Sequence, residues 1–125
     1  MPELPEIVEA YISAYNARDI DRMIACLADE IHFRNFSGTE LTAEAVGTAA
    51  FADLARFGAS AFASRRQTVT HAISVFDTTV ANIDFVAVVA MDLPNGWKAG
   101  QELSFKGSSL FRIANGKIVN IIDQS

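Results

Sequence analysis

The sequence predicts an α+β fold in which three N-terminal helices are packed on a curved, mostly antiparallel sheet. Helical spacing of apolar residues is confined to the first half of the chain, and alternating or continuous apolar runs fill the second half. Short links between those runs, among them Asn115-Gly116, are typical of hairpins in an antiparallel meander. Because an apolar sheet face needs cover, we expect the helices to lie together on one side of the sheet.

Three helices are expected before the meander. Pro5 suits the first turn of a helix, and apolar residues then recur at helical spacing up to Tyr15. Asp19 can cap a second, short helix. Thr42 can cap a third helix that reaches at least Phe57.

Five strands are expected, and the last four follow one another with short links. The earliest strand therefore joins one edge of a four-stranded meander. The 125 residues correspond to a single domain spanning 1–125. The expected strands are residues 31–36, 67–76, 79–91, 101–113 and 117–123.

Composition excludes several classes of protein. The net charge is −5 and Arg65–Arg66 is the only basic cluster, which argues against a nucleic-acid partner. A single cysteine, Cys26, allows no internal disulfide. The first ten residues lack a secretory apolar segment and no run is long enough to span a bilayer, so we expect a cytoplasmic protein without a membrane partner. No motif implies a cofactor, and two histidines and one cysteine at unrelated spacings give no metal-ligand set.

Strand parity places polar residues on the inner, apolar face of the sheet. A buried polar group without a partner costs about 1–3 kcal/mol, so these groups need one another, water or a ligand. We therefore expect an apolar pocket for a small hydrophobic, aromatic or carbonyl ligand. The polar residues assigned to the inner face are Asn35, His71, Ser109 and, if Val119 and Ile121 also face inward, Asp123. The aromatic residues expected around the ligand are Phe33, Phe85, Phe105 and Phe111, with Trp97 in the loop of residues 93–100.

The segment "AYISAYNARDIDRMIACLADEIHFRNFSG" and the later "FRIANGKIVNI" resemble the nuclear transport factor 2-like superfamily. Its small bacterial members include ketosteroid isomerases and polyketide cyclases of the SnoaL type. The order and spacing of the motifs match nearly the whole chain. The resemblance implies a cone-shaped fold with a pocket between sheet and helices, usually in a homodimer.

The resemblance also implies roles for individual residues. The catalytic tyrosine of the isomerases corresponds to Tyr11, their carboxylate base to Asn35 and their second oxyanion donor to Ser109. An amide is not a useful base near neutral pH, so the usual isomerase reaction is not expected. The acid/base aspartate of the cyclases, on the final strand, corresponds to Asp123.

Each candidate has a structural alternative. Tyr11 is either a hydrogen-bond donor in the pocket or a packing residue, and His71 is either an acid or base or a hydrogen-bonded core histidine. Asp123 is either an acid/base group or a solvated terminal residue. Trp97 either covers the pocket mouth or packs on the sheet rim. A Ser109–His71–Asp123 triad is not favoured, because the serine lacks a nucleophile-elbow context.

The leading hypothesis is a cofactor-independent enzyme of isomerase, cyclase or dehydratase (lyase) type that transfers a proton next to a carbonyl. His71 or Asp123 would move the proton, while Tyr11 and Ser109, helped by Asn35, would donate hydrogen bonds to the developing oxyanion. The alternative is a non-catalytic ligand-binding or dimerisation domain of the same fold.

A homodimer through the outer face of the sheet is also expected. Residues 83–91 are apolar on both faces apart from Asp84, whereas a strand with one solvated face would alternate. Val86, Val88 and Ala90 then need cover, which a second copy of the sheet supplies.

Overall fold

The computed structural model describes residues 3–125, which form three helices and one six-stranded sheet. The strand order across the sheet is β2-β1-β6-β5-β4-β3. None of the helices in this part of the chain is long and apolar enough to cross a membrane. The elements are α1 (Glu6–Asn16), α2 (Ile20–Ala25), β1 (Leu27–Ser37), β2 (Glu40–Val46), α3 (Thr48–Ala61), β3 (Phe62–Val75), β4 (Thr78–Val89), β5 (Glu102–Ala114) and β6 (Lys117–Gln124).

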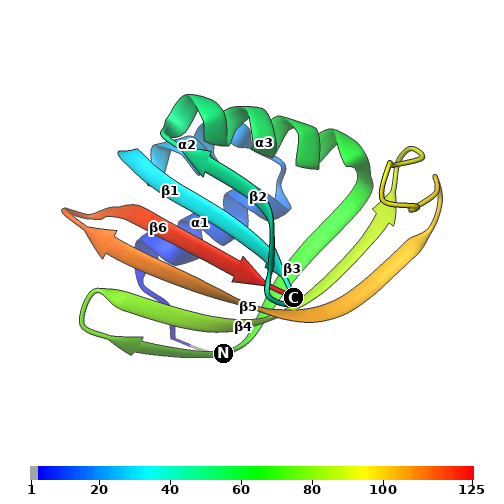
Figure 1. Cartoon of the computed structure of the whole chain (residues 1–125). Coiled ribbons are helices and arrows are strands. Elements are labelled where there is room, and N and C mark those ends of the chain that lie inside the picture. Colours follow the sequence, from blue (N-terminus) through cyan, green and yellow to red (C-terminus); the bar gives the residue numbers. More distant parts are fainter. Residues whose placement is uncertain (1–2) are drawn as a thin grey trace.

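The last four strands form the expected antiparallel meander, and the sheet is curved (Figure 1). Between β5 and β6, Asn115 and Gly116 have φ angles of 53° and 76°. Positive φ at both central residues is what a tight type I′ hairpin turn needs, which is why Asn-Gly suits this link. Strand β1 joins the meander beside β6, with which it pairs in parallel.

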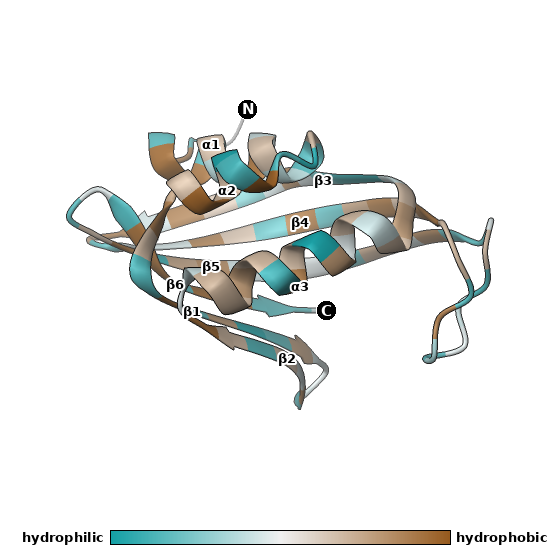
Figure 2. Cartoon of the chain, turned by 90° about the horizontal axis from the view of Figure 1, so that it is seen from above, coloured by the Kyte–Doolittle hydropathy of each residue, from teal (hydrophilic) through white to brown (hydrophobic). Residues whose placement is uncertain are grey.

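The three helices lie over one face of the sheet (Figure 2). Helix α1 contacts β3 and β6, and α3 contacts β1, β2 and β3. The α+β class with helices covering a curved sheet is therefore confirmed, while the conical shape implied by the resemblance stays a prediction. Fully buried core side chains come from both layers and include Val8, Ile31, Phe111, Ile118 and Ile121.

The third helix begins later than expected, and Thr42 does not cap it. Gly38, with a φ of 58°, reverses the chain after β1, and residues 40–46 return along β1 as the edge strand β2. Thr42 lies within that strand. Helix α3 begins after Gly47, whose φ of 87° favours glycine. A polar edge strand is hard to distinguish from a helix start because it has few buried positions, and among its residues only Ala45 is buried.

Candidate active site

A cavity of about 850 Å³ lies between the helices and the inner face of the sheet. Side chains from all three helices and all six strands line it, and most are apolar or aromatic. Among the described residues that line it, Asp123 is the only acidic side chain and Arg65 the only basic one. A concave, largely apolar cavity with convergent polar groups is the usual form of a small-molecule site. Within residues 3–125, no three histidine, cysteine, aspartate or glutamate side chains gather where they could share a metal ion.

Asp123 lies in β6 between two polar neighbours on the adjacent strands. Its register partners are Asn35 on β1 and Ser109 on β5. Ser109 Oγ donates a hydrogen bond to Asp123 Oδ1 at 2.6 Å. Burial raises the pKa of Asp123 from 3.8 to about 6, and the hydrogen bond from Ser109 acts in the opposite direction because it stabilises the charged form. The carboxyl is therefore mostly ionised at neutral pH but can accept and return a proton there.

The small residues in β5 make room for the chain around Asp123. A Cβ on Gly107 would lie only 2.7 Å from the backbone oxygen of Gln124, which passes beside it at the end of β6. No side chain is tolerated at that distance without a shift of the backbone. Gly107 thus allows β6 to lie close to β5, and Ser109, two residues further on, holds the Asp123 carboxyl.

Tyr11 projects from α1 into the cavity, where it is 5% exposed. Its ring packs edge-on against Phe111, at a centroid distance of 5.9 Å, and is tilted against Phe51. Burial raises the pKa of Tyr11 well above its ordinary value, and the charge of Asp123 raises it further. The phenol therefore stays protonated at neutral pH. Its hydroxyl donates to no side chain or backbone group of residues 3–125, so it is available to a ligand.

Asn35 faces the cavity, but its amide is engaged locally. Nδ2 donates to Thr42 Oγ1 at 2.8 Å, and Thr42 Oγ1 donates to the Asn35 backbone oxygen at 3.1 Å. Ser109 also differs from the expectation, because it gives its proton to Asp123 instead of leaving it free for an oxyanion. Both residues thus belong to the cavity wall around Asp123, and Tyr11 is the unengaged donor.

Four of the five expected aromatic residues line the cavity: Phe33, Phe85, Phe105 and Trp97. The loop between β4 and β5 carries Trp97, whose ring lies 6.3 Å from that of Phe62. Phe111 does not line the cavity. It is 1% exposed and packs beneath Tyr11, so the prediction for Phe111 as a ligand contact is wrong and its role is in the core.

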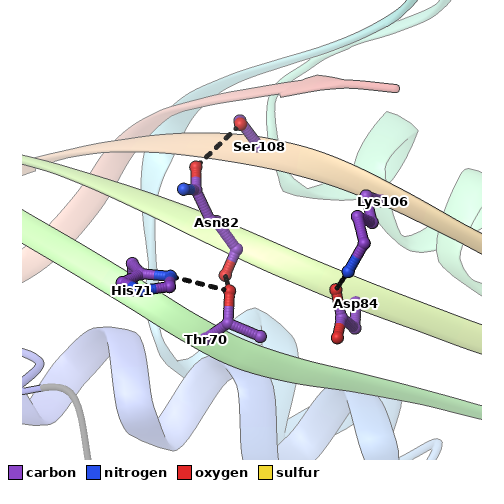
Figure 3. Close-up of polar contacts among 6 residues, drawn as sticks. All are labelled: Thr70, His71, Asn82, Asp84, Lys106 and Ser108. Atoms are coloured by element: carbon purple, nitrogen blue, oxygen red, sulfur yellow. Dashed lines mark hydrogen bonds and ion pairs between the residues drawn. The ribbon is translucent and has the colours of Figure 1, made fainter.

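The prediction that His71 points inward is also wrong. Val69 pairs with Ile83, but His71 pairs with Asn82, so Thr70 is an extra residue in β3. This bulge reverses the parity of the strand, because side chains alternate with a period of two. His71 is exposed on the outer face, with Nδ1 3.3 Å from Thr70 Oγ1, beside the Asn82–Ser108 and Asp84–Lys106 contacts (Figure 3). It lies outside the cavity lining and cannot take part in a site there.

Arg65 is a cavity residue that the sequence did not predict, because it was noted there only as part of the basic pair Arg65–Arg66. Arg65 is 8% exposed and lines the cavity. Its guanidinium carbon lies 3.8 Å from the centre of the Tyr15 ring, and Nη2 donates to the Tyr15 backbone oxygen at 3.2 Å. A signal was available, because β3 begins at Phe62 and alternation traced back from Val69 reaches Arg65 on the inner face.

The fold agrees with comparisons to known proteins. The model of the SnoaL-like domain family matches residues 8–121, so the chain belongs to that family and its resemblance to the nuclear transport factor 2-like superfamily is confirmed. No match was found among curated proteins.

Solved structures share the fold at low sequence identity. A protein with a ketosteroid isomerase-like fold from Catenulispora acidiphila, in complex with trimethylamine, is 15% identical, with a TM-score of 0.80 over 97% of this chain and 85% of that one. A candidate polyketide cyclase from Xanthomonas campestris pv. campestris is 23% identical, with a TM-score of 0.73 over 95% and 87% of the two chains. An epoxide hydrolase from M. tuberculosis is 16% identical, with a TM-score of 0.72 over 94% and 78%. These likenesses establish the fold and not the reaction.

Proposed function

We propose that the protein is an enzyme of isomerase, cyclase or lyase type in which Asp123 transfers a proton at a carbon next to a carbonyl group. The observation that carries the proposal is the position of the Asp123 carboxyl, held by Ser109 inside an apolar cavity. A carboxyl in such surroundings is a stronger base than one in water. The raised pKa of about 6 supports this, because a base poised near the working pH is efficient in both directions of proton transfer.

In this mechanism the Asp123 carboxylate removes a proton from the carbon beside the carbonyl. The C–H electron pair forms the carbon–carbon double bond of an enolate, and negative charge moves to the carbonyl oxygen. The neutral Tyr11 hydroxyl donates a hydrogen bond to that oxygen. The protonated Asp123 then returns its proton to the same or another carbon. In a lyase the enolate instead expels a leaving group from the β-carbon, and in a cyclase it attacks a second carbonyl carbon; Asp123 then gives its proton to the departing group or to the new alkoxide. Ser109 orients the carboxyl, and Asn35 shapes the adjacent wall.

The competing function is ligand binding without catalysis, in a cavity of the same kind. Several neighbours in fold are described as enzymes, and two were crystallised with small molecules. Those descriptions fit both functions. The distinction depends on whether Asp123 accelerates loss of a proton from carbon.

The proposal is tested by exchange of carbon-bound hydrogen with solvent. α-Tetralone and cyclohexenone are incubated with the protein in deuterium oxide, and NMR follows loss of the signals beside the carbonyl. We expect the natural protein to accelerate exchange of at least one ketone. Asp123→Asn should lower the rate to that of the uncatalysed reaction, because an amide cannot accept the proton.

Asp84→Asn is the matched control. Asp84 is an aspartate on the outer face of the same sheet, ion-paired with Lys106 at 2.9 Å, and its loss changes net charge equally. Exchange should be unaffected by this substitution. Undiminished exchange in the Asp123→Asn protein, or no acceleration of either ketone by the natural protein, would contradict the proposal.

We also propose a homodimer through the outer face of the sheet. Large apolar side chains are exposed on that face, among them Val80, Val86 and Ile73, at 37%, 49% and 66%. Val86 also lines a hollow of about 540 Å³ formed by β3, β4 and β5. The apolar positions alternate with the polar pairs of Figure 3, which fits an interface with a mixed rather than uniformly apolar character.

Light scattering after gel filtration tests the dimer. The natural protein should have twice the monomer mass at micromolar concentration. Val86→Glu should yield monomer, because it replaces an apolar contact in the interface with a charge that must be desolvated there, even beside its register partner Arg66. Leu41→Glu, also on an exposed side chain but in the edge strand β2, is the control. A natural protein that is only monomeric would refute the dimer.

A further inference from the structure

Arg65 is a buried cation without an acidic partner. The ion pairs formed within residues 3–125 do not include it. Nη2 donates to the Tyr15 backbone oxygen, but Nε is fully buried and has no hydrogen-bond partner in the described part of the chain. Burial lowers the pKa of Arg65, which shows the cost of taking its charge out of water. Buried charges are normally paired, so this arrangement calls for an anion.

The stacking on Tyr15 does not remove this need. A cation–π contact is worth about 0.5–2 kcal/mol, whereas an effective penalty of several kcal/mol accompanies burial of an ion. The Tyr15 ring instead holds the planar guanidinium in one orientation. On another side, Gly58 of α3 packs closely against the guanidinium, because a Cβ there would lie only 3.3 Å from Nη1. The guanidinium is thus held in place by Tyr15 and α3, and Arg65 forms part of the cavity wall.

Arg65 and Asp123 face the same cavity without pairing with each other. The pKa of Asp123 is governed by burial and by Ser109. Tyr11 and Tyr15, by contrast, feel both charges. The charge of Asp123 raises the pKa of each phenol, and the charge of Arg65 lowers it. The two tyrosines therefore lie within reach of both charges, which occupy separate parts of one cavity.

We propose that Arg65 binds the carboxylate of an acidic ligand whose aromatic or alicyclic body fills the apolar cavity. Guanidinium presents a planar set of donors that matches a carboxylate, and Nη1, unlike Nε, is a donor without a partner in residues 3–125 that is not fully buried. The inference rests on the proposed function for the other end of the ligand, where a carbonyl lies beside Asp123 and Tyr11. Together they define the substrate class as a keto acid with an apolar body.

Acid and amide pairs of equal shape test this subsite. Benzoate and cinnamate are titrated against benzamide and cinnamamide at slightly above neutral pH, with the arginine side chains labelled with nitrogen-15. We expect at least one acid to bind about tenfold or more tightly than its amide, because a charge-assisted hydrogen bond is stronger than a neutral one. The Arg65 Nε–H resonance should shift with the acid and not with the amide.

Arg65→Met and Arg66→Met form a matched pair. Arg66 is the next residue in β3 and is exposed, and its substitution by methionine removes the same net charge. Arg65→Met should abolish the preference for the acid while leaving amide affinity within about twofold, and Arg66→Met should keep the preference. If Arg65→Met does not fold, the acid–amide comparison and the Arg65 resonance of the natural protein still decide the question.

Two results would overturn the inference: equal or absent binding of all four probes by the natural protein, or an acid preference that survives Arg65→Met. Its failure is separable from failure of the proposed function. Ketone exchange that depends on Asp123 without any acid preference refutes only the Arg65 subsite. An acid preference that depends on Arg65 without any ketone exchange refutes only the proton-transfer reaction.

Discussion

Asn35 and Asp123 are register partners on the parallel strands β1 and β6, so their side chains lie next to each other on the inner face of the sheet. The resemblance to ketosteroid isomerases assigns their base to the position of Asn35, where this chain has an amide. The carboxyl is found one strand away. A ligand bound over this wall can therefore meet a carboxylate at nearly the same place, supplied by β6 and oriented by Ser109.

Asp123→Asn should make the protein more stable at alkaline pH. The folded-state pKa of Asp123 is raised from 3.8 to about 6, so the folded protein binds this proton more tightly than the unfolded chain. Stability from this group is complete below pH 3.8, is lost as the pH rises to about 6, and is constant above that. At about pH 8 the variant should be more stable by at most about 3 kcal/mol, because it lacks the buried charge.

Urea denaturation at several pH values measures this difference. The gain in unfolding free energy should disappear at about pH 4, where the natural Asp123 is protonated in the folded state. NMR of a carbon-13-labelled carboxyl gives the pKa directly. A value near 3.8 in the folded protein would mean that the carboxyl is solvated, and the mechanism would lose its base.

Tyr11→Phe should reduce turnover without changing stability. The ring contacts with Phe51 and Phe111 are kept, and the hydroxyl has no partner among residues 3–125 to lose. The free energy of unfolding should change by less than about 0.5 kcal/mol. Loss of one donor to a developing oxyanion typically lowers kcat by about a hundredfold. A rate of ketone exchange equal to that of the natural protein would reduce Tyr11 to a packing residue.

His71→Ala should leave both ligand binding and ketone exchange unchanged. His71 is exposed on the outer face, and its nearest polar contact is Thr70 Oγ1 at 3.3 Å. Titration of benzoate and measurement of α-tetralone exchange check this, with Asp123→Asn as the positive control for loss of activity. A clear loss of exchange would require His71 to reach the cavity in a conformation other than the one described.

How well sequence reasoning located the site depended on the regularity of each strand. In β5 and β6 the alternation continues without interruption from Phe111 and Ile121 to Ser109 and Asp123. Parity placed Ser109 on the inner face, but it left Asp123 conditional, because Ile118, Val119, Ile121 and Ile122 are all apolar and allow either register. In β3 a single extra residue, Thr70, reversed the parity and misplaced His71. A bulge has no reliable signature in composition, because its effect depends on the register with a neighbouring strand.

Residues at the edges of elements were the hardest to assign. The edge strand β2 has few buried side chains, so its pattern was mistaken for the start of a helix at Thr42. Arg65 was missed because charged residues are rarely buried, and its burial depends on Tyr15 of α1, which is distant in sequence. The family resemblance indicated the positions of Tyr11 and Asn35. It did not indicate which hydrogen bonds each side chain makes, because these depend on contacts with neighbouring strands.

Moving the carboxyl from β6 to β1 tests whether the two positions are equivalent. Asn35→Asp alone places a second carboxyl next to Asp123, and repulsion between the two charges should raise at least one of the two apparent pKa values above 6. The double variant Asn35→Asp/Asp123→Asn keeps a single carboxyl and nearly the same volume. Its new carboxyl lies in the same apolar cavity, so desolvation should hold its pKa above the ordinary value of about 3.9.

We expect the double variant to recover part of the ketone exchange that Asp123→Asn loses, because the displaced base still faces the cavity and Tyr11 remains available as donor. Recovery should be incomplete, since Ser109 orients a carboxyl on β6 and Asn35 is engaged with Thr42. Carbon-13 NMR of the carboxyl and the exchange rate are measured on the same sample. If the residue 35 carboxyl titrates near 3.9 and is insensitive to benzoate, the side chain lies in solvent and the correspondence with the isomerase base is incorrect. If instead its pKa is raised but no exchange returns, β1 faces the cavity yet does not reach the reacting carbon, and the geometry of catalysis depends specifically on β6.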